Sequence, residues 1–216
     1  MKMKIINDLV QWEKAWLEAR AWKISWTKLW IVMAWPKAQD SLIYELIAET
    51  ISPLEETYQT PAMERGNYLE QFWVEEYEKQ TWDKVSFAGL VVKNEYHICS
   101  PDWLVYNKDN LITKALEVKC LSAKKMLKYM TCDSFLDVYK IDKLYFWQVI
   151  NYFLVIDTLE SLTFYLYNPD IYDKNMQTYS IPITRAELQT DIDKAEEKLK
   201  GFKENWDNLK LKLLKW

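Results

Sequence analysis

Histidine and glycine are almost missing from this chain of 216 residues, which has one histidine, His97, and three glycines. One histidine excludes a zinc site built on two or three histidines within one chain, and also the H-E-x-x-H site of metalloproteases. The glycines, Gly66, Gly89 and Gly201, are spaced too widely for a phosphate-binding P-loop or a dinucleotide-binding fingerprint. A Ser-His-Asp triad would have to use His97, and no nucleophile elbow accompanies it.

Cysteines and long apolar runs are also scarce. The three cysteines, Cys99, Cys120 and Cys132, form no close pair, which favours reduced thiols over a disulfide framework. No uninterrupted apolar run is long enough to span a bilayer, and the N-terminus turns acidic before an apolar signal core develops. We therefore expect a cytoplasmic protein.

Carboxylates and lysines are plentiful, and they are suited to Mg²⁺ chemistry because this hard cation prefers oxygen ligands. The formal net charge of −4 argues weakly against a general nucleic-acid binder. Between positions 114 and 128, however, five lysines accompany a single acidic residue. This strip could bind a phosphate backbone, and the alternative is a solvated helix face.

The hydrophobic pattern predicts an α/β protein with a central mixed sheet flanked by helices and a helical N-terminal segment. Helices are predicted over 8–20, 27–35, 41–51 with Ser41 as N-cap, 61–80 beginning at Pro61, and 140–157. Strands are predicted over 84–93, 95–99, 103–107, 111–120, 161–167 and 178–183, and the chain from 185 onward is predicted to be helical. We expect one domain over 1–216, with an N-terminal segment (1–60), a catalytic core (61–184) and a C-terminal helix (185–216).

One group of charged residues indicates chemistry. Strand alternation places Glu117 and Lys119 on one face of the predicted central strand and Val118 on the other. Charged groups on a buried strand are costly unless they are paired, and a metal ion would pair with the carboxylate. Asp102, at the start of an earlier strand, can point into the same site. Lys119 could then orient an attacking water or stabilise the developing charge on phosphorus.

An acid followed by Glu-x-Lys is the pattern of the restriction-endonuclease-like nucleases, although Glu-x-Lys by itself also occurs in many solvated strands. Across residues 10–170 the chain resembles the phage lambda exonuclease family, whose members act in recombination. Five blocks carry the resemblance, in the family's order: 19–27, 62–70, 99–104, 116–120 and 145–149. The combination of Ser-Pro-Asp, Glu-Val-Lys-Cys and Trp-Gln-Val is specific.

The resemblance implies a restriction-endonuclease-like core and Mg²⁺- or Mn²⁺-dependent hydrolysis of linear duplex DNA from its 5′ ends. It implies that Asp102 and Glu117 bind the metal, that Glu70 lies near a second metal or the water network, and that Lys119 assists the nucleophile. Contacts to the 5′-terminal phosphate are implied for four residues: Arg20, Thr27, Ser100 and Gln148.

The same resemblance implies a homotrimer, cooperation with a single-strand annealing protein, and a bacterial host cytoplasm. The sequence departs from the family at Ile150, where a second glutamine is frequent, and this puts part of the substrate contact in doubt. Two alternatives stay open: a related endonuclease, and a catalytically degenerate DNA-binding or assembly protein on a nuclease fold. A related type of exonuclease that holds an iron–sulfur cluster needs four cysteines, and the three scattered cysteines of this chain cannot supply them.

Tryptophan is unusually abundant, with 12 residues against three glycines, whereas glycine makes up about 7% of an average chain. Several tryptophans stand where the resembling family has glycine: Trp22, Trp26, Trp35, Trp82 and Trp103. Some bacteria decode UGA as glycine and others as tryptophan, so a gene from a glycine-decoding host, read with the other code, would give this sequence. The alternative is a genuine Trp-rich protein in which Trp103 stacks on a base.

Overall fold

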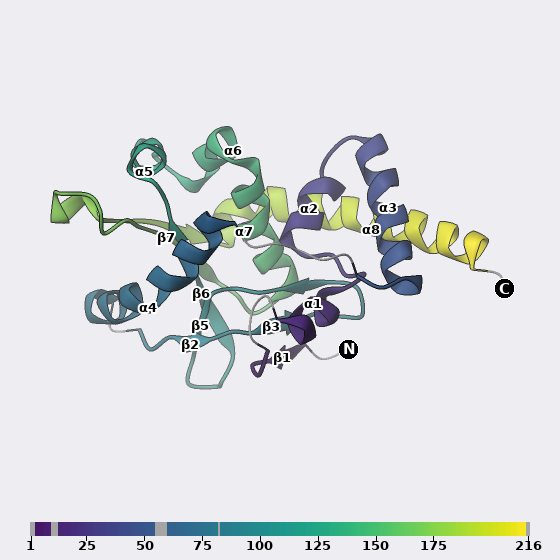
Figure 1. Ribbon diagram of the computed structural model, residues 1–216, viewed down its shortest axis with the longest axis horizontal. Coiled ribbons are helices and arrows are strands. Elements are labelled where there is room, and N and C mark those ends of the chain that lie inside the picture. The colour runs from purple at the N-terminus through teal and green to yellow at the C-terminus, as the bar shows by residue number, and fades with distance from the viewer. Residues whose placement is uncertain (1–2, 10–12, 55–59, 82, 215–216) are drawn as a thin grey trace.

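A five-stranded mixed sheet lies at the centre of the protein (Figure 1). The computed structural model describes residues 3–9, 13–54, 60–81 and 83–214, and for part of the helix over 61–81 it describes the backbone alone. The strand order is β2-β5-β6-β7-β8, in which β6 and β7 are parallel and the other neighbours antiparallel. The strands are β2 Ser86–Phe87, β5 Trp103–Tyr106, β6 Ile112–Cys120, β7 Ser161–Tyr167 and β8 Thr178–Thr184. The expected central strand and mixed sheet are confirmed.

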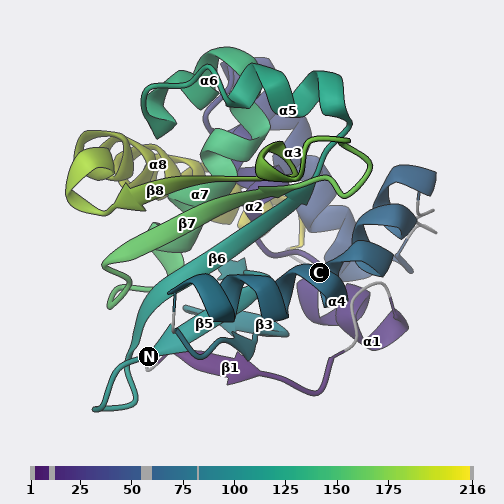
Figure 2. The same ribbon diagram turned by 90° about the vertical axis from the view of Figure 1, so that its left-hand side faces the viewer.

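Helices cover both faces of this sheet (Figure 2). The helix α7, Lys143–Val155, connects β6 to β7, because parallel neighbours need a crossover. It packs into the main core together with α2, Trp26–Val32, and α8, Gln189–Leu213. On the other face, α4, Pro61–Thr81, contributes Trp73 and Tyr77 to a smaller core that includes Leu116 and Val118 of β6. The side chains of β6 therefore alternate between two separate cores.

A second, three-stranded sheet joins the N-terminus to the strands that precede the site. Its order is β1-β3-β4, with β1 Lys4–Ile6, β3 Leu90–Val92 and β4 Ile98–Cys99. Gly89 lies where the chain passes closest to β1, and a Cβ at this position would come within 2.3 Å of the Ile6 carbonyl oxygen. This close approach requires glycine.

The N-terminal helices α1, Lys14–Arg20, and α3, Pro36–Ile51, flank α2. Two backbone hydrogen bonds tie the segment between α1 and α2 to β4 and to the residues just before it. Ile24 donates to Tyr96 O at 2.6 Å, and Ile98 donates to Ile24 O at 3.0 Å. These bonds hold the end of α1 beside the strand that leads to Ser100 and Asp102.

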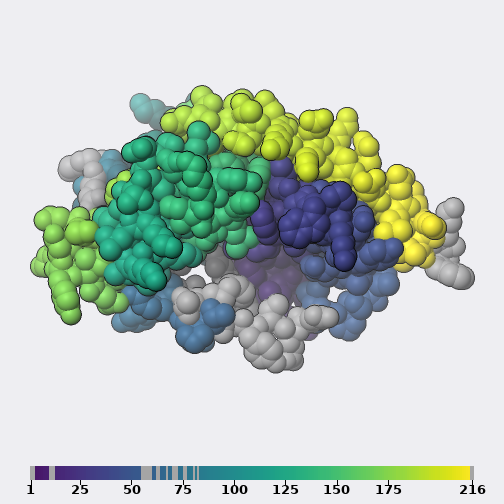
Figure 3. Space-filling model, turned by 90° about the horizontal axis from the view of Figure 1, so that it is seen from above, coloured from purple at the N-terminus to yellow at the C-terminus, as the bar shows by residue number. Residues whose placement is uncertain are grey.

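Seen from above, α8 forms one long edge of the molecule, next to the segment from α5 to α7 and to α2 (Figure 3). The short helices of this segment are α5, Ala123–Tyr129, which was expected only as the helix-face alternative for the lysine strip, and α6, Val138–Ile141. Short 3₁₀ turns lie at Phe135–Asp137, Lys174–Met176 and Ala186–Leu188. In the described part of the chain, no helix combines the length and the apolar character needed to cross a membrane.

Several predicted elements were wrong in detail. The helix expected over 41–51 begins at Pro36, whose fixed φ suits the first turn, so Ser41 is not its N-cap. Ser41 instead lies inside the helix and donates to the carbonyl oxygen of Lys37 at 3.2 Å. The single strand expected over 84–93 is two short strands in different sheets, β2 and β3, separated at Gly89. The helix expected over 140–157 begins at Lys143, because Asp142 caps it by accepting from the backbone N–H of Leu144.

Candidate active site

Glu117 is the most buried charged group of the site, with 1% of its surface exposed. Strand β6 places it on the face that α7 covers, as alternation predicted, while Val118 packs into the smaller core on the opposite face. Lys119 lies on the same face as Glu117 and donates to Glu117 Oε1. The expected pairing of a carboxylate and an ammonium on one side of the central strand is present.

The two carboxylate oxygens of Glu117 have different partners. Besides Lys119, Oε1 accepts from Gln148 Nε2 at 2.6 Å, and Oε2 accepts from the hydroxyl of Tyr152. Both of these side chains come from α7, four residues apart, which places them on the same side of the helix. These contacts offset the cost of burying a charged carboxylate.

Asp102 reaches the same place from the start of β5. Its Oδ2 accepts from the backbone N–H of Val118 at 2.7 Å, which fixes the carboxylate beside β6. The register of β5 on β6, in which Trp103 lies opposite Leu116, brings Asp102 to the level of Glu117. The structure therefore brings Asp102, Glu117 and Lys119 together.

Lys119 is a buried cation in an acidic setting. Burial by itself would lower the pKa of Lys119, but Glu117 and then Asp102 outweigh it, so this pKa is raised above its usual value. The ammonium also lies 4.9 Å from the centroid of the Tyr145 ring, and Lys125 of α5 lies at the same distance from that ring. Lys119 is therefore a permanently protonated donor at neutral pH.

The donor set fits a hard divalent cation. Asp102 and Glu117 supply carboxylate oxygens, and Mg²⁺ is commonly held by one or two carboxylates while it keeps several waters. Among the residues that the structure describes, no group of three or more His, Cys, Asp and Glu side chains is gathered as a metal site. The predicted further carboxylate, Glu70, lies in α4, and its side chain is outside the described residues.

Arg20 stands at the edge of this cluster, in the last turn of α1. Burial lowers its pKa to about 10, an effect that the nearby Tyr152 and Cys99 oppose, so the guanidinium stays charged at neutral pH. Its guanidinium carbon lies 4.1 Å from the centroid of the Trp16 ring. A cation held beside Tyr152 and the Glu117 cluster fits the predicted role in phosphate binding.

The other three residues predicted to contact phosphate have hydrogen bonds within the protein. Ser100 donates to Gly89 O at 2.7 Å, and the hydroxyl of Thr27 lies 3.2 Å from that of Ser25. Both amide hydrogens of Gln148 are accounted for, since Nε2 contacts Glu117 Oε1 and the Tyr152 hydroxyl, the latter at 2.7 Å. In this arrangement Gln148 supports Glu117, and its own Oε1 has no hydrogen-bond partner among the described residues.

Tyr152 is the site residue that the sequence interpretation missed. Burial, and then the charges of Glu117 and Asp102, raise the pKa of Tyr152 well above its usual value, so the hydroxyl keeps the proton that it donates to Glu117. Its position four residues after Gln148 was the available signal.

The backbone conformation bears on the tryptophans that stand at glycine positions. Trp22 has a φ of 48°, in the left-handed region that favours glycine, and the other described non-glycine residue in this region is Asn110. Trp35 has a φ of −77°, and Trp26 lies within helix α2, so neither position requires glycine. Trp82 lies outside the described residues.

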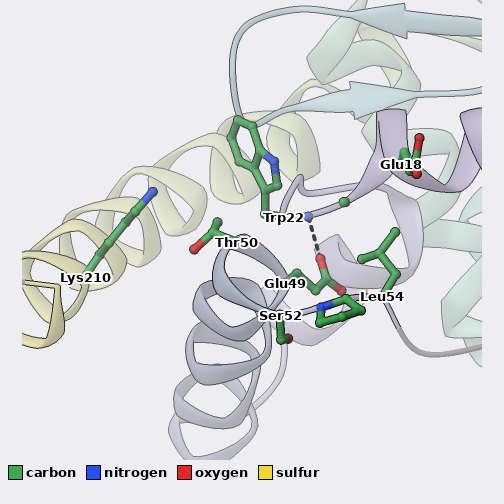
Figure 4. Close-up of a pocket in the computed structure, with 9 residues that line it drawn as sticks. Glu18, Trp22, Glu49, Thr50, Ser52, Leu54 and Lys210 are labelled. Atoms are coloured by element: carbon green, nitrogen blue, oxygen red, sulfur yellow. Dashed lines mark hydrogen bonds between the residues drawn. The ribbon is translucent and has the colours of Figure 1, made fainter.

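Trp103 and Trp22 differ in their surroundings. The Trp103 indole packs edge-on against Trp73, away from the Glu117 face, and its buried N–H has no hydrogen-bond acceptor among the described residues. Trp22 lines a pocket of about 500 Å³ between α1, α3 and α8 (Figure 4). Its backbone N–H donates to Glu49, while its indole points away from Glu49.

Comparison with solved structures finds the same fold. An alkaline exonuclease from Laribacter hongkongensis superposes with a TM-score of 0.70 at 23% identity, covering 94% of this chain and 99% of that chain. The same enzyme in complex with dAMP gives identical values. A phage-related exonuclease from Haemophilus somnus 129PT superposes with a TM-score of 0.62 at 15% identity, covering 87% of this chain and 94% of that chain.

Comparison of sequences identifies the family. No curated protein matches the chain. Residues 15–158, which are well over half of the chain, match the family described as YqaJ-like viral recombinase domain. This match and the shared exonuclease fold confirm the resemblance to the lambda exonuclease family. The protein is thus a member of the YqaJ-like viral recombinase domain family.

Proposed function

We propose that the protein is a Mg²⁺-dependent deoxyribonuclease that degrades one strand of linear duplex DNA, in the 5′→3′ direction. The observation that carries the proposal is the buried Glu117, paired with Lys119 and adjacent to Asp102. The names of the exonucleases that share the fold agree with it. By family resemblance, we further propose that the protein works as a homotrimer with a single-strand annealing protein, in the cytoplasm of a bacterial host.

The residues of the chain have distinct tasks in this hydrolysis. Asp102 and Glu117 would hold Mg²⁺, which supplies Lewis-acid stabilisation and an activated water when it is bound. The Lys119 ammonium is fixed between Glu117 and the Tyr145 ring, where it can donate to a phosphate oxygen as negative charge develops. Its contact with Glu117 fixes the ammonium as a hydrogen-bond donor beside the metal ligands.

End recognition is assigned to Arg20. A guanidinium offers two parallel N–H donors to a terminal phosphate, and the bonds that tie Ile24 to β4 hold the end of α1 beside the cluster. A 5′-phosphate at Arg20 would place the first phosphodiester near Glu117. This arrangement favours cleavage from an end over cleavage within a strand.

The test uses three substrates: linear duplex with 5′-phosphates, linear duplex with 5′-hydroxyls, and covalently closed circular duplex. Each substrate is incubated with Mg²⁺ or with EDTA, and acid-soluble nucleotides are measured. We expect release from linear DNA with Mg²⁺ alone. Asp102→Asn and Glu117→Gln each remove a charged ligand and should lower the rate by at least about a hundredfold. Glu160→Gln, a change at an exposed acid, is the control and should leave the rate unchanged.

Two results would contradict the proposal. Cleavage that persists in EDTA would exclude the metal, and a wild-type rate in the Glu117→Gln variant would exclude this site. Rapid cleavage of the closed circle would favour the endonuclease alternative.

A further inference from the structure

Tyr152 contacts Glu117, and the proposed reaction assigns no role to this contact. The ring is fully buried in α7 and its hydroxyl donates to Glu117 Oε2. The same hydroxyl accepts from Gln148 Nε2 at 2.7 Å, and it lies 3.3 Å from the carbonyl oxygen of Ser100. One hydroxyl thus connects β6, α7 and the segment that precedes Asp102.

The two oxygens of Glu117 are not equivalent in this arrangement. Oε1 accepts from the Lys119 ammonium and from the Gln148 amide. Oε2 accepts from the neutral hydroxyl of Tyr152. With Oε2 fixed by a neutral donor, the carboxylate cannot rotate freely, and Oε1 keeps its contact with Lys119.

We infer that Tyr152 is a positioning residue for a metal ligand: its hydroxyl fixes the orientation of the Glu117 carboxylate. The inference rests on the proposed function. A hydrogen-bonded partner behind a ligand orients that ligand and raises metal affinity, and loss of such a partner typically weakens binding by about 10- to 100-fold. Gln148 completes the clamp, because its amide contacts both Glu117 and the Tyr152 hydroxyl.

The informative substitution is Tyr152→Phe, which removes the hydroxyl and keeps the ring that fills the core. Tyr129→Phe is the matched control, since Tyr129 is also fully buried but its hydroxyl has no hydrogen-bond partner among the described residues. Glu117→Gln serves as the variant that lacks the ligand itself. All three changes are made in the full chain.

Mn²⁺ binding is measured without DNA, from the electron paramagnetic resonance signal of the free ion, so that the result does not depend on catalysis. We expect Tyr152→Phe to weaken Mn²⁺ binding by about tenfold and Tyr129→Phe to leave it unchanged. In cleavage assays, the Mg²⁺ concentration for half-maximal rate should rise by a similar factor in Tyr152→Phe. The half-saturating DNA concentration should stay the same, and a general loss of structure would not give this split.

The outcomes separate the inference from the proposed function. If Glu117→Gln loses Mn²⁺ binding while Tyr152→Phe binds Mn²⁺ as tightly as wild type, the positioning role of Tyr152 is wrong, and the assignment of Glu117 as a metal ligand is supported. If Glu117→Gln binds Mn²⁺ as tightly as wild type, both the assignment of Glu117 as a metal ligand and the inference about Tyr152 are wrong. Thermal unfolding of each variant is recorded. Should Tyr152→Phe not fold, Gln148→Leu tests the same clamp, and unchanged Mn²⁺ binding in that variant overturns the inference.

Discussion

Replacing Trp22 by glycine and by alanine measures how strongly the backbone at this position demands glycine. Trp22 has a φ of 48°, and an L-residue with a Cβ pays about 1–2 kcal/mol in the left-handed region. Glycine avoids that cost but loses about 0.5–1 kcal/mol more through its greater freedom in the unfolded chain. Both variants lose the indole equally, so its packing cancels in the comparison. We therefore expect the glycine variant to be more stable than the alanine variant by about 1 kcal/mol.

The assay is urea unfolding followed by circular dichroism, with the free energy of unfolding extrapolated to water. Trp30, in the interior of helix α2, is the matched control, because alanine is favoured over glycine there by about 1 kcal/mol. The order of stability should therefore be opposite at the two sites. If alanine at position 22 is as stable as glycine, the backbone does not require glycine and the argument fails.

The nucleotide sequence tests the origin of the same residue. A UGA codon at position 22 supports a host that decodes UGA as glycine, and UGG there ends that explanation. The indole N–H of Trp103 has no acceptor among the described residues, and this favours the same account at position 103, because a buried donor without an acceptor costs about 1–3 kcal/mol.

Two further expectations follow from buried charged or titratable groups. Arg20→Ala should erase the preference for 5′-phosphorylated over 5′-hydroxyl ends, measured as the ratio of the two rates, and equal rates in wild type would dispose of this role. Burial lowers the pKa of His97 to about 4, so its contribution to stability is present above pH 6.5 and is lost as pH falls toward 4. Between pH 7 and pH 4, the free energy of unfolding measured in urea should fall by about 3 kcal/mol more in wild type than in His97→Gln. An equal fall in the two proteins would contradict the reasoning.

The core of the site could be predicted because strand alternation is a strong local rule. Glu117 and Lys119 share a face for that reason, and the position of Asp102 at a strand start indicated that it could point into the same site. Tyr152 was missed because most residues of α7 are apolar and buried. A tyrosine in such a helix looks like packing until the neighbouring strand shows a carboxylate at its hydroxyl.

The elements that were wrong depend on distant contacts. The run from 84 to 93 has the composition of one strand, but Gly89 lets the chain pass close to Ile6, so its two halves join different sheets. The pairing of β3 with β1, which is far away in sequence, determines that the run is divided between two sheets. The local sequence pattern contains no information about this pairing. The role of Gln148 is similar, since only its contacts reveal that its amide hydrogens are used by Glu117 and Tyr152.

The position of α7 as the crossover between β6 and β7 has an evolutionary consequence. The strand with Glu117 and the helix with Gln148 and Tyr152 belong to one β-α-β unit, and residues 121–142 form an excursion between them. Every described side chain that hydrogen-bonds Glu117 lies outside that excursion. Its buried residues, such as Met126 and Tyr129, belong to the main core, whereas its exposed residues form part of the outer surface. Substitutions at these exposed positions can therefore change the outer surface while the hydrogen bonds that hold Glu117 are kept.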